Sequence, residues 1–62
     1  MSAEESLERA EQLMDRLEQA RARLEATTDP DAAIEVITEL AEIAREVEAA
    51  LSQAKREADA ET

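Results

Sequence analysis

The sequence contains no cysteine, histidine, glycine or aromatic residue, and its one proline is Pro30. Without cysteine and histidine it can form no disulfide and no thiolate zinc site, and it lacks the usual general base. Without glycine there is no Gly-rich loop to bind a phosphate, and without aromatic rings nothing can stack on bases or sugars. These absences predict a chain that is not an enzyme and that binds no cofactor or metal.

Basic residues are also scarce, since 7 Lys and Arg stand against 17 Asp and Glu, giving a formal net charge of −10. Phosphate backbones and anionic lipids are bound through Lys and Arg, so we expect no direct contact with nucleic acid and none with a membrane. Apolar runs are short, and the N-terminus is acidic where a secretion signal would be basic. A cytoplasmic location is the expectation that follows.

The first part of the chain predicts an amphipathic helix from about residue 3 to about residue 26. Ser2 is placed to cap its N-terminus, and Glu4 and Glu5 suit the positive end of the helix dipole. Apolar residues recur at alternating steps of three and four, which places them on one stripe of the helix. The stripe consists of Ala10, Leu13, Leu17, Ala20 and Leu24, with Leu7 and Met14 beside it.

A turn at residues 27–30 is expected to end this helix and to begin another. Thr27 and Thr28 are β-branched and weaken a helix, and Pro30 disfavours a helical conformation at Asp29. Proline is favoured at the first position of a new helix, with aspartate before it as the cap. A turn this short predicts antiparallel neighbours. The alternative is one long helix kinked at Pro30, at a cost of about 3 kcal/mol.

The second helix is expected from about residue 30 to about residue 59, with residues 60–62 as a frayed tail. Its apolar residues alternate in steps of three and four, the heptad pattern of a coiled coil or helix bundle. The whole chain, residues 1–62, therefore predicts a single all-α domain, an antiparallel, coiled-coil-like two-helix hairpin. The heptad residues are Ala33, Ile37, Leu40, Ala44, Val47, Leu51, Ala54 and Ala58.

The second helix carries more apolar surface than one neighbouring helix can bury, because further aliphatic residues flank the heptad series. A hairpin of this size also has a small core. We therefore expect dimerisation into a four-helix bundle, although a larger protein subunit could cover the same surface. The expected core is Leu13, Leu17, Leu24, Ile37, Leu40, Val47 and Leu51, and the expected intermolecular surface is Ile34, Val36 and Ile43.

Two rows of charged residues each have a chemical and a structural interpretation. An acidic row on the second helix could bind Mg²⁺ or Ca²⁺, as in an all-α metal-dependent hydrolase, but it points away from the expected core and is better explained as a solvated face. Arginines spaced by seven on the first helix could bind anions, but interhelical and i,i+4 ion pairs are the favoured interpretation. The rows are Glu35, Glu39, Glu42 and Glu46, and Arg9, Arg16 and Arg23 beside Glu11, Glu18 and Glu25.

The first helix and the turn resemble those of the exodeoxyribonuclease VII small subunit, a short acidic helical hairpin. The resemblance is carried by Leu7-Glu8-Arg9-Ala10, Arg16-Leu17-Glu18 and Arg23-Leu24-Glu25, followed by Pro30. It implies an accessory subunit that coats a large nuclease subunit and contributes no active-site residue. The residues themselves predict a non-catalytic structural or protein-interaction module that self-associates, with the accessory subunit as the alternative.

Overall fold

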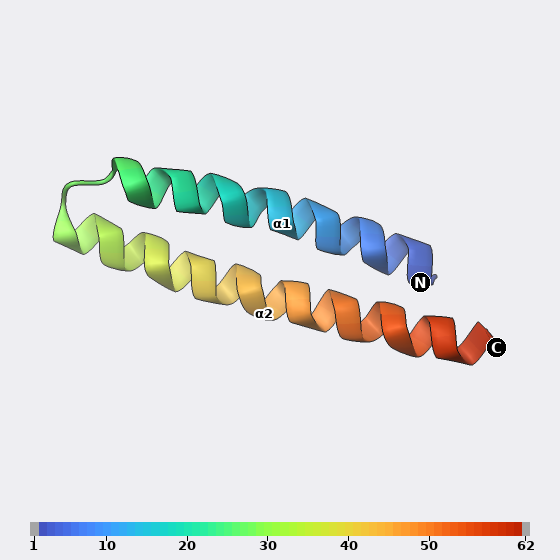
Figure 1. Ribbon diagram of the computed structural model, residues 1–62. Coiled ribbons are helices and arrows are strands. Elements are labelled where there is room, and N and C mark those ends of the chain that lie inside the picture. The colour runs from blue at the N-terminus through green and yellow to red at the C-terminus, as the bar shows by residue number, and fades with distance from the viewer. Residues whose placement is uncertain (1, 62) are drawn as a thin grey trace.

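The computed structural model describes residues 2–61 and shows two helices that lie side by side in opposite directions (Figure 1). Helix α1 spans Ala3–Ala26 and helix α2 spans Pro30–Glu61. Together they form a rod of 50 × 14 × 12 Å, with both chain ends at the end opposite the turn. The described residues therefore form an all-helical hairpin, and the alternative of one kinked helix is wrong.

Helix α1 begins at a complete capping box. Ser2 has extended backbone angles, and its Oγ accepts a hydrogen bond from the amide of Glu5 at 3.2 Å. In return, the Glu5 carboxylate accepts from the backbone amide of Ser2 at 3.3 Å. Two amides of the first turn, which have no partner within a helix, are satisfied in this way.

The turn at Thr27–Asp29 closes one helix and opens the next with side-chain hydrogen bonds. Thr27 donates from its amide to the carbonyl of Leu24 and from its hydroxyl to the carbonyl of Arg23, at 3.2 and 2.7 Å. Asp29 caps α2, because its Oδ1 accepts from the amide of Asp31 at 3.1 Å. Pro30 is the first residue of α2, a position at which its missing amide hydrogen has no consequence.

Helix α1 faces α2 with the apolar stripe that its sequence predicts. Ala10, Leu13 and Ala20 are buried, and Leu17 packs against them from a half-buried position. The same spacing continues one step toward the N-terminus to Ser6, which is also buried. The smallest residues of the stripe let the helix axes approach, so the core consists of thin layers contributed by two helices.

Helix α2 faces α1 with a stripe that is rotated from the expected one. Leu40, Val47 and Ala54 lie in the interface as expected, but Val36 and Ile43 take the positions expected for Ile37 and Ala44. Ile43 is 1% exposed and belongs to the core of the hairpin, whereas Ile37 is 52% exposed. Val36 and Ile43, expected on the intermolecular surface, therefore belong to the core, whereas Ile37 and Leu51, expected in the core, are exposed.

The C-terminal end of α2 is longer than expected. The helix continues through Ala60 to Glu61, where the sequence predicts fraying after residue 59. Thr62, the last residue of the expected tail, lies outside the described residues. Because α2 has 32 residues and α1 has 24, α2 projects beyond α1 at the open end of the hairpin (Figure 1).

Candidate interaction surfaces

One flank of the contact between the helices is charged, and we call it the polar side. Arg16 Nη1 lies 3.6 Å from Glu46 Oε2, and Arg23 Nη2 lies 2.9 Å from Glu39 Oε1. These pairs confirm the interhelical interpretation for two of the three arginines. All four side chains are substantially exposed, so each pair adds between about 0 and 1 kcal/mol and mainly sets the direction and register of the helices.

The acidic row of α2 is divided by these contacts. Glu39 and Glu46 turn toward α1 and pair with arginines, while Glu35 and Glu42 are exposed to solvent. Within residues 2–60, no three acidic side chains come together as they would around a metal ion. The row is thus partly an interhelical flank and not only the solvated face that the sequence predicts.

A shallow groove of about 240 Å³ opens on the polar side toward the open end of the hairpin. Its floor is apolar, because Leu13, Ala49 and Ala50 leave space between the helices, and Arg9 and Glu46 stand at its rim. Arg9, the third arginine of the predicted row, therefore borders this groove. Small side chains account for the groove, since alanines fill less of the space between the helices than the aliphatic residues nearer the turn.

The polar cluster beside the groove is not apparent from the apolar pattern of the sequence. The hydroxyl of Ser6 donates to Glu57 Oε1 at 3.1 Å, and the amide nitrogen of Gln53 donates to the same oxygen. Serine does not count toward an apolar pattern, so Ser6 was not assigned to the stripe. Stepping back by four from Ala10 would have identified it.

A further ion-pair group lies on α1. Arg21 contacts Glu18 and Glu25 in the same helix, which are the i,i+3 and i,i+4 spacings expected for a charged flank. The hydrogen bond and charge of Arg21 lower the pKa of Glu18, and the same contact raises the pKa of Arg21. Because all three side chains are exposed, these ion pairs contribute little to the stability of the hairpin.

The opposite flank carries the exposed large apolar side chains of the described residues, and we call it the apolar side. We call the residues in the contact between the helices the seam. On α1, Leu7 and Met14 each follow a seam residue, Ser6 or Leu13, by one position. On α2, Ile37 and Leu51 follow the seam residues Val36 and Ala50 in the same way. The arginines and glutamates of the polar side each precede a seam residue. One residue turns an α-helix by about 100°, so the two sets lie on opposite flanks. The exposed set is Leu7, Met14, Ile34, Ile37 and Leu51.

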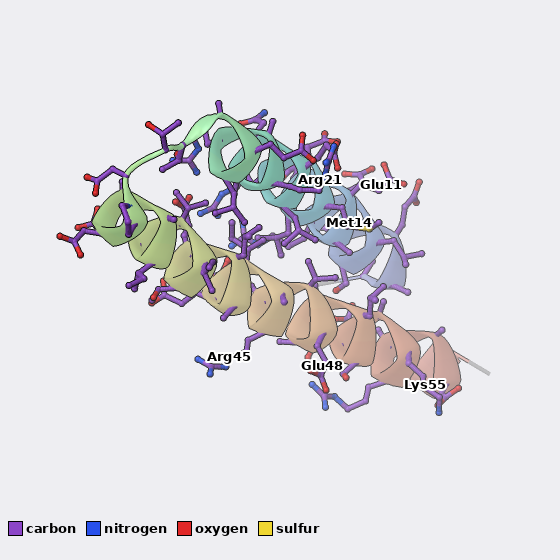
Figure 2. The ribbon with its side chains drawn as sticks, turned by 60° about the vertical axis from the view of Figure 1, so that its left-hand side comes forward. Glu11, Met14, Arg21, Arg45, Glu48 and Lys55 are labelled. Atoms are coloured by element: carbon purple, nitrogen blue, oxygen red, sulfur yellow. The ribbon has the colours of Figure 1, made fainter. Side chains whose placement is uncertain are left out.

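The apolar residues of both helices share one side of the hairpin. The Arg16–Glu46 and Arg23–Glu39 pairs join the two flanks that carry the charges, so the remaining flanks face the other way together. Ile34, at 62% exposure, extends this surface toward the turn, and Ala41 and Ala44 lie within it. Figure 2 shows Arg45 extending from α2 away from α1.

The ten residues that the sequence singled out are thus divided between two surfaces. Ile34, Ile37 and Leu51 lie on the exposed apolar side. The others lie in the contact between the helices, buried or half-buried: Leu13, Leu17, Leu24, Val36, Leu40, Ile43 and Val47.

Comparison with known proteins gives no match to a protein family, to a characterised sequence or to a solved structure. Neither helix, over the residues described, has an apolar stretch of the length and low charge needed to span a bilayer.

Proposed function

We propose that this chain is a non-catalytic structural or protein-interaction module that associates with a second copy of itself to form an antiparallel four-helix bundle. One observation carries the proposal. The exposed large apolar side chains of α1 and α2 gather on the same side of the hairpin, where α1 also carries charged residues such as Glu18 and Arg21, while the interhelical ion pairs occupy the other side. Apolar patches of this kind, bordered by polar residues, are typical of protein interfaces.

The dimensions of the hairpin support a second hairpin as the partner. A side of 50 by 14 Å offers about 700 Å² to a flat partner, close to the roughly 800 Å² that each protein buries in a standard interface. Twofold dimers are the commonest assembly of identical chains, and two stacked hairpins make a four-helix bundle. Burial of Ile37 and Leu51, which the hairpin leaves half in water, would favour association by about 1 kcal/mol or more for each side chain.

Sedimentation equilibrium of the wild-type chain and two charge variants tests the proposal. Ile37→Glu places a carboxylate in the apolar side, while Ala49→Glu adds the same charge to α2 at an exposed position on the polar side. At micromolar concentration we expect two chains per particle for the wild type and for Ala49→Glu, and one for Ile37→Glu. Circular dichroism should show all three to be helical. A wild-type chain that sediments as a compact helical monomer would overturn the proposal.

An accessory subunit of a larger enzyme is the second candidate, supported by the resemblance to the exodeoxyribonuclease VII small subunit. The Leu7–Ala10 segment that carries part of this resemblance contributes Leu7 to the apolar side. A large subunit would then cover the surface in place of a second copy. The test is co-migration of the chain with the large subunit of that nuclease in size-exclusion chromatography, and loss of co-migration in Ile37→Glu.

A further inference from the structure

Helix α2 carries most of the apolar side. Its exposed residues follow one another in steps of three and four from Ile34 to Leu51, and within this stripe only Glu48 is charged. On α1 the corresponding flank alternates Leu7 and Met14 with charged residues, among them Glu11, Glu18 and Arg21. A partner that buries apolar surface and avoids charge should therefore contact α2. The α2 stripe consists of Ile34, Ile37, Ala41, Ala44, Glu48 and Leu51.

Interhelical contacts fix which residues lie at the same height along the rod. Arg16 pairs with Glu46, Arg23 with Glu39, and Ser6 with Glu57, so the residue numbers at one height add up to 62 or 63. This relationship applies to each copy in an assembly. It predicts the contacts for either direction in which a second hairpin can dock.

Docking with both turns at the same end would place apolar residues against charges. A twofold axis parallel to the helices sets α2 of one copy on α1 of the other, at unchanged heights. Ile37 then meets Glu25 of the second copy, and Leu51 meets Glu11. Such contacts would remove water from the carboxylate of Glu11 and from the Arg21–Glu25 ion pair, which is unfavourable.

Docking with the turns at opposite ends gives matched contacts instead. It sets α2 on α2 in antiparallel directions, and the register in which Ile34 faces Leu51 of the second copy also makes Ala41 face Ala44. Two small residues at the twofold axis allow the helices to approach closely. In this register Lys55 reaches the turn of the second copy, where Asp29 and Asp31 flank Pro30. Figure 2 shows Lys55 on the side of α2 away from α1, where its exposed Nζ lies 3.5 Å from Asp59 Oδ2 of the same helix.

We infer that the chain dimerises through an antiparallel contact between two α2 helices, with the twofold axis between Ala41 and Ala44 and with Lys55 beside the acidic turn of the second copy. This inference rests on the proposed self-association and adds its surface, direction and register. The opposite charges of Lys55 and the Asp29–Asp31 turn favour this register over one shifted by a helical turn. The least favourable contact in this register is that of the Glu48 carboxylate with the apolar side chain of Ile37 in the second copy.

Single-cysteine variants test the direction of docking, because the chain has no cysteine of its own. Ala44→Cys places thiols on both sides of the twofold axis, within reach of each other or of a short bismaleimide. Ala58→Cys places them at opposite ends of the dimer, about 46 Å apart at 1.5 Å per residue. In the same-direction arrangement both variants would bring their two thiols to equal heights. Ala22→Cys, which is exposed on the outer surface of α1, is the control that should not cross-link.

We expect efficient cross-linking of Ala44→Cys and none above the control for Ala58→Cys, measured by denaturing electrophoresis. Sedimentation equilibrium of each reduced variant should show that it assembles like the wild type. Cross-linking of Ala58→Cys as readily as Ala44→Cys would overturn the inferred direction and leave self-association intact. A dimer in which neither variant cross-links would overturn the α2 contact. A wild-type chain that sediments as a monomer would overturn both the inference and the proposed function.

Discussion

The hydroxyl of Ser6 on α1 donates a hydrogen bond to the carboxylate of Glu57 on α2, over 3.1 Å, near the open end of the hairpin. The two residues lie 51 positions apart in the sequence. Ser6 is 1% exposed, so this bond takes a place that apolar pairs occupy elsewhere along the seam. It joins the ends of the helices that the turn constrains least.

Replacing this serine should weaken the hairpin. We expect Ser6→Ala to lower the free energy of unfolding by about 1 kcal/mol, because the hydrogen bond to Glu57 is lost, partly offset by the better helix propensity of alanine. Ser52→Ala, at an exposed position of α2, is the matched control and should be neutral or slightly stabilising. Urea unfolding followed by circular dichroism measures both. Equal stability of the two variants would show that the Ser6–Glu57 bond contributes nothing.

Two isoleucines of α2 should differ sharply in their effect on folding. Ile43 is 1% exposed and Ile37 is 52% exposed. We expect Ile43→Ala to lower the free energy of unfolding of the single hairpin by about 3 kcal/mol, and Ile37→Ala by less than about 1 kcal/mol. Thermal melts at concentrations where sedimentation shows one chain per particle separate folding from association. The reverse order would place Ile37, and not Ile43, in the core.

The capping box of α1 should make stability depend on pH in the acidic range. Hydrogen bonds from the backbone and hydroxyl of Ser2 hold the pKa of Glu5 below its ordinary value of 4.5. A lowered pKa in the folded state means that the ionised carboxylate stabilises the fold above the unfolded pKa, and that this stabilisation is lost as pH falls through the folded pKa.

Glu5→Gln supplies the comparison, since glutamine can accept the same capping bond but does not titrate. Between about pH 6 and about pH 3 we expect the Tm of the wild type to fall further than that of Glu5→Gln, with the difference developing below the ordinary pKa of glutamate. Superimposable pH profiles would show that the carboxylate charge is not part of the cap.

Salt should promote association of the hairpins. Each chain carries a formal net charge of −10, so two chains repel each other, and raising the salt from ~0.02 M to ~0.5 M shortens the screening length to a few ångströms. We expect a tighter dimer at high salt in sedimentation equilibrium. Lys55→Glu replaces a positive by a negative charge, which makes the net charge of each chain more negative by two, and should steepen this dependence. Dissociation by salt would mean that attractive ion pairs outweigh the net repulsion.

Removing the one charge within the α2 stripe should strengthen the dimer. Glu48 would face Ile37 of the second copy, so Glu48→Leu exchanges a desolvated carboxylate for an apolar contact. We expect the dissociation constant to fall by at least about tenfold, equivalent to 1.4 kcal/mol. Glu42→Leu makes the same exchange at an exposed position on the polar side and should leave the constant nearly unchanged. A similar gain from both variants would indicate non-specific apolar association.

The hairpin could be predicted from the sequence because the apolar pattern and the turn residues indicate the same helix boundaries. The apolar residues of α1 permit only one stripe, and Pro30 after Asp29 specifies both the end of one helix and the start of the next. In α2 two heptad series overlap and share Leu40, Val47 and Ala54. Periodicity alone cannot decide whether Ile43 or Ala44 accompanies them, because both series have the same spacing.

The choice between the series depends on the other helix. With Val36 and Ile43 inside, Glu39 and Glu46 fall beside Arg23 and Arg16, where opposite charges meet. The residues left outside then form the apolar side, so the candidate interface could not be separated from the core before the two helices were placed together. The contact of Ser6 with Glu57 could not be predicted for a similar reason, because the partner of Ser6 lies near the far end of the chain.

The turn reverses the chain without any residue in the left-handed region, and no residue of either helix visits that region in the part of the chain that the structure describes. Every backbone position is therefore open to ordinary L-amino acids without conformational strain. An outward-facing residue can be exchanged without disturbing the path of the main chain, so the hairpin could acquire new binding specificities on its outer surfaces while keeping the same frame.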